Sequence, residues 1–165
     1  MAKAKSAVPE GLHTLTPHLI LDDAARAIDW YKKALGAVEV SRSPGPDGKI
    51  MHAQIRIGDS AIYLNDEMGG GKSAKARGGS PISMWLYVDD CDALFNRAVA
   101  AGATVPDGPM GQIADQFWGD RAGSIVDPHG YHWTIATRKE DLTPQEIEQR
   151  QAEFMKKFAP QPTRA

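Results

Sequence analysis

The stretch Leu21-Asp-Asp-Ala-Ala-Arg-Ala-Ile-Asp-Trp-Tyr-Lys-Lys-Ala-Leu-Gly-Ala37 decides the fold, because a similar stretch follows as Val88-Asp-Asp-Cys-Asp-Ala-Leu-Phe-Asn-Arg-Ala-Val-Ala-Ala-Gly-Ala103. Each copy starts with an apolar residue and two aspartates, continues in a helical pattern and ends in Gly-Ala. A short carboxylate can accept hydrogen bonds from the free N–H groups of a first helical turn, and glycine commonly ends a helix. The sequence therefore predicts the same strand-helix unit twice.

Strand-like runs surround both predicted helices. Apolar residues recur at helical spacing in each copy. They are Ala24, Ile28, Tyr31 and Leu35 in the first copy and Cys91, Leu94, Phe95 and Ala98 in the second. One strand precedes each helix and three short strands follow it, with turns rich in Gly, Pro and Asp between them. The expected strands are 13–21, 37–43, 50–57 and 61–65, then 80–88, 103–105, 121–127 and 131–136.

The predicted fold is therefore α+β, with two tandem βαβββ modules and a C-terminal helix. Thr143-Pro-Gln-Glu146 forms a capping box with proline at the first helical position, and the helix should continue to about Phe158. It would pack on its own domain or on a second subunit. The expected division is a tail at 1–13, a first module at 14–68, a flexible Gly-rich linker at 69–79, a second module at 80–138 and the C-terminal helix and tail at 139–165.

Composition narrows the class of protein. With 165 residues, 42% of them hydrophobic, the chain is long enough to form a packed globular core. The formal charge of −2 and the lack of a basic stripe argue against nucleic acid and anionic membranes as partners. No apolar run has the length of a signal peptide or membrane span, so we expect a cytoplasmic protein. The single cysteine, Cys91, excludes an internal disulfide framework.

Alternation along the strands predicts two faces, one covering a helix and one left for a ligand. On the expected strand 80–88, Ile82, Met84, Leu86 and Val88 fit the helix face, leaving Ser83, Trp85 and Tyr87 on the second face. The other strands add Thr16, His18, His52, Gln54, His132 and Thr134 to the second face. Aromatic and polar side chains together are typical of a small-molecule cleft. A buried dimer interface or a solvent-exposed face is the alternative.

The duplicated unit resembles the vicinal oxygen chelate superfamily, which includes glyoxalase I, bleomycin resistance proteins and dioxygenases. The resemblance rests on Leu21-x-Asp23, Ile28-Asp-Trp-Tyr31, Leu35-Gly-Ala37 and the late Trp118-Gly-Asp-Arg-x-Gly-x-Ile-x-Asp-Pro-x-Gly130, and it covers about residues 14–137. The Trp118-Gly119 pair, the Asp-Pro-x-Gly turn and His132-Trp133 are most similar to the bleomycin resistance and PhnB-like branch. The resemblance implies a homodimer whose clefts are built from both modules, and sometimes from both subunits.

Metal-dependent members of the superfamily place His, Glu, His and Glu on the first, fourth, fifth and eighth strands. The resemblance puts Thr16, Tyr63, Ser83 and Thr134 at those positions, and these do not form a competent ligand set for such a metal. We therefore expect neither metal nor cofactor. A displaced site formed by His18, His52 and His132 is the alternative geometry.

The sequence leads to one principal hypothesis, a metal-independent small-molecule-binding protein that sequesters an antibiotic or related metabolite. Aromatic side chains would stack on the ligand and polar side chains would supply hydrogen bonds. A lyase, epimerase or dioxygenase of the same superfamily, with a displaced metal or a histidine base, is the rival, and a purely structural dimer is a third class. The candidate ligand-binding residues are Thr16, His18, His52, Gln54, Tyr63, Ser83, Trp85, Tyr87, Phe117, Trp118, His132 and Thr134.

Overall fold

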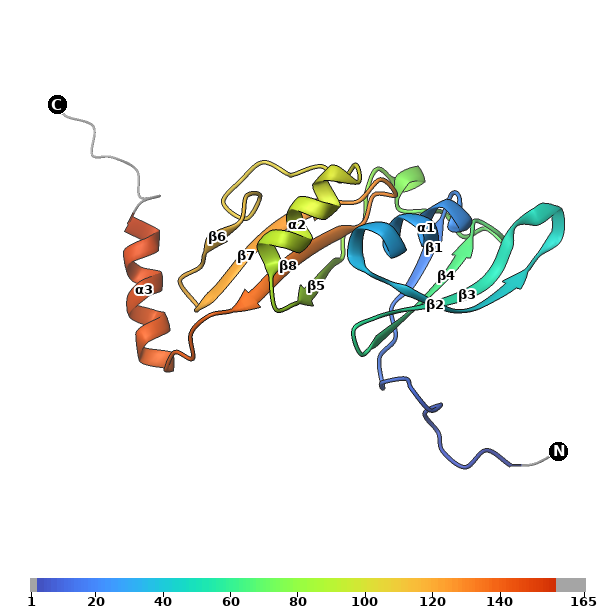
Figure 1. Cartoon of the computed structure of the whole chain (residues 1–165), viewed down its shortest axis with the longest axis horizontal. Coiled ribbons are helices and arrows are strands. Elements are labelled where there is room, and N and C mark those ends of the chain that lie inside the picture. Colours follow the sequence, from blue (N-terminus) through green and yellow to red (C-terminus); the bar gives the residue numbers. More distant parts are fainter. Residues whose placement is uncertain (1–2, 157–165) are drawn as a thin grey trace.

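The computed structural model describes residues 3–156 and contains two four-stranded sheets (Figure 1). Sheet A comes from the first half of the chain, in the order β1-β4-β3-β2, and one helix packs on it. The first strand pairs in parallel with the fourth, and the other pairings are antiparallel. Its elements are β1 (His18–Leu21), α1 (Ala24–Leu35), β2 (Val38–Pro44), β3 (Ile50–Ile57) and β4 (Ser60–Asp66).

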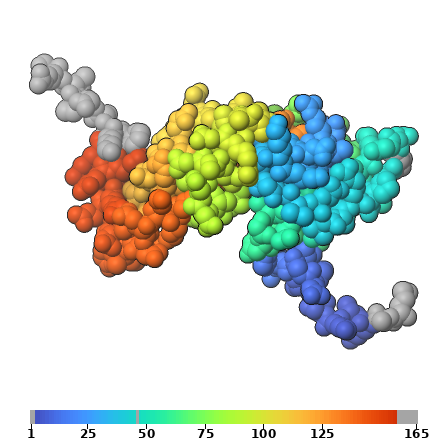
Figure 2. Space-filling model, in the orientation of Figure 1, coloured from blue at the N-terminus to red at the C-terminus, as the bar shows by residue number. Residues whose placement is uncertain are grey.

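Sheet B repeats this topology in the order β5-β8-β7-β6. Its first strand in the sequence, β5, pairs in parallel with its last, β8, and the other pairings are antiparallel. The two halves of the sequence occupy opposite ends of the molecule (Figure 2). The prediction of two tandem βαβββ modules is therefore confirmed. The elements of sheet B are β5 (Ser83–Tyr87), α2 (Cys91–Ala100), β6 (Ala114–Asp115), β7 (Asp120–Val126) and β8 (His132–Arg138).

Both helices begin at the predicted aspartates. The Oδ1 atom of Asp23 accepts a hydrogen bond from the N–H of Arg26 at 2.9 Å, and Asp90 does the same for Ala93 at 2.9 Å. Gly36 closes α1 in the left-handed region at φ 71°, which is why a glycine stands there. The two predicted apolar stripes are buried in the core, so the helical spacing identified the packed faces correctly.

Three local expectations were wrong. The expected strand 103–105 is reduced to a single bridge between Thr104 and Val126, and the outer strand of sheet B is instead β6. Pro106 and Gly108 follow directly and cannot continue a ladder. Ile82, expected on the helix face, precedes β5 and is 69% exposed. Thr134, expected on an open face, is buried.

Side chains and backbone join the two modules on the helix side. The hydroxyl of Tyr31 in α1 of the first module donates to Oδ2 of Asp127 in the second module at 2.8 Å, although the two residues are 96 positions apart in the sequence. The Tyr131 hydroxyl donates to the carbonyl of Ile20 at 2.8 Å and accepts from its N–H at 3.0 Å. Trp30 Nε1 donates to the carbonyl of Ala101 at 2.8 Å. The last of these bonds joins α1 to the end of α2, and the two helices lie side by side in Figure 1.

The C-terminal helix, α3 (Pro144–Lys156), begins with the predicted capping box. Thr143 Oγ1 accepts from the N–H of Glu146 at 3.3 Å, and Glu146 Oε2 accepts from the N–H of Thr143 at 2.8 Å. None of its described residues is buried, and the helix stands at one end of the molecule (Figure 1). The expected end near Phe158 lies outside the described residues. In the described part of the chain no helix is long and apolar enough to cross a membrane.

The glycine-rich segment 69–79 contains a short 3₁₀ turn, η2 (Lys75–Arg77), and a second such turn, η1 (Pro46–Gly48), joins β2 to β3. Ser73, before η2, is buried and bonded to Glu67 Oε1 through both its N–H and its hydroxyl, each at 2.7 Å. Part of this segment is therefore attached to the first module.

Candidate functional site

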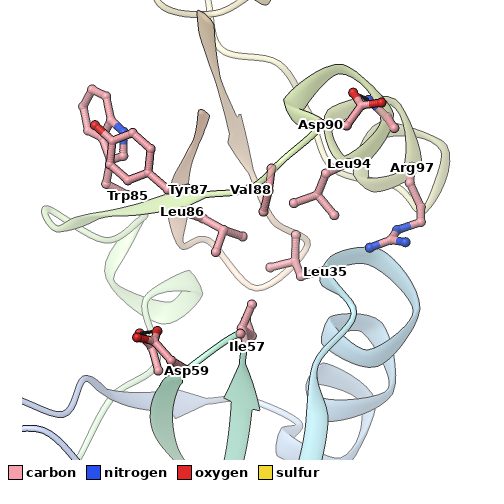
Figure 3. A pocket seen from close by; sticks show the side chains of 13 residues that line it. Leu35, Ile57, Asp59, Trp85, Leu86, Tyr87, Val88, Asp90, Leu94 and Arg97 are labelled. Carbon is pink, nitrogen blue, oxygen red and sulfur yellow. Dashed lines mark hydrogen bonds between the residues drawn. The ribbon is translucent and has the colours of Figure 1, made fainter. Parts of the chain in front are cut away.

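Two exposed aromatic side chains lie on the second face of sheet B, the face opposite its helix. Trp85 and Tyr87 alternate with Leu86 on β5, so their rings stack against each other with centroids 6.4 Å apart. Figure 3 shows both rings on the side of β5 opposite Leu86 and Val88. They remain 48% and 56% exposed, which is unusual for rings that have no role outside the core.

The turn between β6 and β7 adds two more rings to this surface. Trp118 meets Trp85 edge to face at 6.2 Å between centroids, and Phe117 meets Trp118 at 4.9 Å. Phe117 in turn contacts Phe154 of α3 at 5.4 Å, so the C-terminal helix is connected to the same cluster. We call Trp85, Tyr87, Phe117 and Trp118 the aromatic surface.

A buried carboxylate binds two rings of the aromatic surface through hydrogen bonds. Asp120, the first residue of β7, is 1% exposed. Its Oδ2 atom accepts a hydrogen bond from the Tyr87 hydroxyl at 2.8 Å and another from Trp118 Nε1 at 2.9 Å. Burial and this bond to Asp120 raise the pKa of Tyr87, so the phenol keeps its proton at neutral pH and remains a donor. One side chain thus fixes two rings.

Hydroxyl groups and an imidazole lie beside these rings on sheet B. Trp85 pairs in register with Thr134, which in turn pairs with Ser124, and the two hydroxyls are 3.1 Å apart. Ser83 pairs in register with His132 at the start of the same two strands. The second face of sheet B therefore combines stacking surface with hydrogen-bonding groups.

Sheet A carries a separate polar group at the corresponding place. His18 pairs in register with Tyr63, as Trp85 pairs with Thr134 in the second module. The Tyr63 ring contacts His18 and His52 edge to face, with centroids 6.4 Å and 4.8 Å apart, and Gln54 lies next to Tyr63 in register. His18 Nε2 is hydrogen-bonded to Oδ1 of the buried Asn65.

The candidate residues predicted from sequence therefore fall into two groups within one chain. His18, His52, Gln54 and Tyr63 lie together on sheet A, whereas the four aromatic residues, Ser83, His132 and Thr134 lie on or beside sheet B. The three-histidine site considered from the sequence does not form within the chain, because His132 lies on a different sheet from His18 and His52. Across residues 3–156 no three His, Cys, Asp or Glu side chains are grouped to hold a metal ion.

Several hollows lie between the modules, and two of them are lined by Trp85 of β5. A groove of about 650 Å³ runs between the end of α1, the β3–β4 turn, β5 and α2, with Leu35, Leu86 and Leu94 on its floor (Figure 3). A smaller cavity of about 390 Å³ is lined by Thr16, Ser83 and Trp85 among others. Thr16, which precedes β1 in the first module, therefore lines the same cavity as Ser83 and Trp85 of sheet B. Its position in the sequence did not indicate this.

Sequence reasoning missed Asp120 as part of the site. The residue stands in the Trp118-Gly-Asp-Arg motif, which indicates the family but not a contact with the aromatic side chains. Alternation offered a signal, because Asp120 shares a strand face with Ser124, whose hydroxyl faces Thr134. The hydrogen bonds to Tyr87 and Trp118 join residues that are distant in sequence or on opposite sides of a turn, and only the structure reveals them.

Gly119 sets the geometry of the turn that carries Trp118. Its φ is +98°, and a Cβ atom there would lie 2.6 Å from the carbonyl oxygen of Glu140. We expect Gly119→Ala to lower the free energy of unfolding by about 2–3 kcal/mol, from left-handed strain and the clash together. Urea denaturation followed by circular dichroism would measure the loss.

Gly70→Ala is the matched control for Gly119→Ala. Gly70 also has a positive φ, +87°, but no atom lies within 4 Å of the place a Cβ would take. It should therefore lose only the strain, about 1 kcal/mol. Equal losses in the two variants would contradict the role assigned to the contact with Glu140.

Comparison with known proteins agrees with this fold. The family model of the Glyoxalase/Bleomycin resistance protein/Dioxygenase superfamily matches residues 11–135. An uncharacterized protein of Mycobacterium bovis is 48% identical over 139 residues, covering 81% of this chain and 89% of that protein. Solved structures share the fold, and two of them are relevant to the site. A PhnB protein from Bacillus cereus has a TM-score of 0.59 at 14% identity, covering 76% of this chain and 99% of the other.

The second solved structure is a bleomycin-binding protein complexed with bleomycin, with a TM-score of 0.55 at 22% identity, covering 77% of this chain and 99% of the other. At this identity the likeness concerns the fold. The match of the family model over most of the chain, the duplicated βαβββ topology and the 48% identical relative agree with one another. The chain therefore belongs to the glyoxalase/bleomycin resistance protein/dioxygenase superfamily.

Proposed function

We propose that the chain is a metal-independent small-molecule-binding protein that sequesters an antibiotic or a related metabolite without altering it. The aromatic surface carries the proposal, because its rings are held in fixed positions yet remain open on one side. Rings with few rotatable bonds offer a large contact area at a low entropic cost. The solved structure of a bleomycin-binding protein complexed with bleomycin, which has the same fold, supports a small-molecule ligand of the antibiotic class.

Polar side chains of both sheets would supply hydrogen bonds to this ligand. We propose Ser83 and His132 on sheet B and Thr16 beside it, together with His18, His52, Gln54 and Tyr63 on sheet A, while the buried Thr134 would hold the Ser124 hydroxyl instead of meeting the ligand. A homodimer would let sheet A of one protomer face sheet B of its partner, and the resemblance to the superfamily favours such an assembly. In the described part of the chain β5 is an edge strand of sheet B, with Trp85 and Tyr87 exposed on it and Ile82 exposed just before it. Sedimentation velocity should give the mass of two chains, and a single-chain mass would overturn this assembly.

Titration with bleomycin is the direct test of the binding function. Isothermal calorimetry on untagged, gel-filtered protein should show saturable binding, and mass spectrometry should recover bleomycin unchanged. Elemental analysis of the gel-filtered protein, before bleomycin is added, should give far less than one transition metal per chain. A metal near one per chain, or chemical conversion of bleomycin, would overturn the proposal of metal-independent sequestration. The absence of any binding would count against the antibiotic class.

A second candidate is an enzyme that uses acid-base chemistry on sheet A. One observation favours it. Asn65 Nδ2 donates to the carbonyl of Asp66 at 2.7 Å, so Oδ1 faces His18 and pairs with the tautomer of His18 that carries its hydrogen on Nε2. Nδ1 is then the ring nitrogen able to accept a proton. Turnover of an α-keto hemithioacetal that is lost in His18→Gln would support the enzyme, and no turnover would remove it.

A further inference from the structure

The charge beneath the aromatic surface is only partly compensated. Asp120 Oδ2 has two hydrogen-bond donors, but among the described residues the buried Oδ1 atom has none. The cation beside it is Arg138, whose Nη1 forms a long ion pair with Oδ1 at 3.9 Å and whose charge also acts on Tyr87. Arg138 is half exposed, and its Nε donates to Asp141 at 3.0 Å. A buried carboxylate usually has all its acceptor sites filled, so this site keeps net negative character.

The neighbouring positive charge is engaged elsewhere. Arg121, the residue after Asp120, binds both carboxylate oxygens of Asp92 at 2.7 Å. Its Nη1 also reaches Asp115 at 3.2 Å. Because two acidic residues surround this guanidinium, it adds little positive potential to the aromatic surface.

The carboxylate also acts on the rings themselves. Tyr87 and Trp118 both donate their polar hydrogens to Asp120, which places the positive ends of their dipoles toward the carboxylate. Donation to an anion leaves more electron density on the ring, and the face of an aromatic ring already carries the negative part of its quadrupole. Trp85 stacks on one of these rings and meets the other edge to face. Three neighbouring rings and one buried charge thus favour the same sign of ligand.

We propose that the aromatic surface selects organic cations, in which a quaternary or delocalised positive charge is attached to an aromatic group, and that Asp120 confers this selectivity. The inference rests on the proposed binding function and deepens it by naming the charge of the ligand. The aromatic group of the ligand stacks on Trp85 and Trp118, and the cationic group lies over the Tyr87 face. Asp120 acts through these rings and through its partly compensated negative charge.

A pair of probes with one shape and different charge tests the selectivity. The probes are 3-hydroxyphenyltrimethylammonium and its neutral isostere 3-tert-butylphenol. Each is titrated into ¹⁵N-labelled full-length protein, and the indole N–H signal of Trp118, assigned with Trp118→Phe, is followed by NMR. The wild-type protein should bind the cation about tenfold more tightly than the neutral probe.

Asp120→Asn should reduce this ratio to less than about twofold, because the amide removes the charge while its oxygen can still accept hydrogen bonds from Tyr87 and Trp118. Asp115→Asn is the control, because it removes one negative charge from the adjacent strand, where Asp115 is exposed, and it should retain the wild-type ratio. Equal binding of both probes by the wild type would overturn the selectivity and leave the binding function standing. A ratio that survives in Asp120→Asn would overturn the role of Asp120.

The wild-type comparison needs no substitution, so it decides the selectivity even if Asp120→Asn does not fold. Failure of both probes to shift the Trp118 signal would also overturn the inference. The binding function is decided separately by the bleomycin titration, so the two failures are distinguishable.

Discussion

Replacement of Asp127 by alanine is expected to lower the free energy of unfolding by about 3–5 kcal/mol. The carboxylate is buried and accepts four hydrogen bonds. Oδ1 accepts from the N–H groups of His129 and Tyr131 at 2.9 Å and 3.0 Å, and Oδ2 accepts from Tyr31 and Trp133 at 2.8 Å and 2.9 Å. Alanine would leave all four donors without this acceptor, in a part of the molecule that water does not reach.

The lower free energy of unfolding of Asp127→Ala should affect both modules together. Tyr31 belongs to α1, whereas Asp127 and Trp133 belong to the second module, so this carboxylate lies at the junction of the two. Burial, followed by the effect of Asp127, raises the pKa of Tyr31 well above its usual value, so the phenol remains a donor across the neutral range. Urea denaturation monitored by tryptophan fluorescence and by circular dichroism would measure the loss and show whether the modules still unfold together.

Asp107→Ala is the control for Asp127→Ala. Asp107 is an exposed aspartate in the loop between α2 and β6, and its removal should change the free energy of unfolding by less than about 0.5 kcal/mol. A loss below about 1 kcal/mol in Asp127→Ala would contradict the role of this carboxylate as the acceptor that joins the modules.

The architecture was predictable because the signals that specify it are local. Asp23 and Asp90 cap helices through hydrogen bonds that span three residues, and Gly36 adopts the left-handed conformation that follows a helix. The duplication then supplied the topology, since two similar units should fold alike. The outer strand of sheet B was misplaced because residues 103–105 have strand-like composition, whereas the pairing edge of β7 is taken up by Ala114 and Asp115.

The site was predictable only in part, because alternation assigns a strand face but not what covers it. Trp85 and Tyr87 were correctly expected on one face of β5, and they lie together there. Thr134 was expected on the same open face but is buried, since its hydroxyl meets Ser124 of the neighbouring strand. Asp120 depends on a turn geometry and on two long side chains, and neither follows from spacing.

Replacement of Trp118 by alanine is expected to weaken the binding of bleomycin by about 30-fold, corresponding to about 2 kcal/mol. Trp118 contacts Trp85 and Phe117, and its Nε1 atom is fixed by Asp120. Alanine would remove the stacking area and would also release Trp85 from its edge-to-face partner. Because Trp118 is half-buried, we expect Trp118→Ala to lower the free energy of unfolding by less than it lowers the free energy of binding.

Trp118→Phe is the informative comparison, because it keeps an aromatic face of smaller area and removes the N–H that donates to Asp120. We expect it to lose about three- to fivefold in affinity, far less than alanine, if stacking area dominates. Calorimetric titration of both variants at equal protein concentration would measure this. Should Trp118→Ala bind bleomycin as tightly as the wild type, the ligand would have to lie elsewhere, and the groove between α1, β5 and α2 would be the next surface to test.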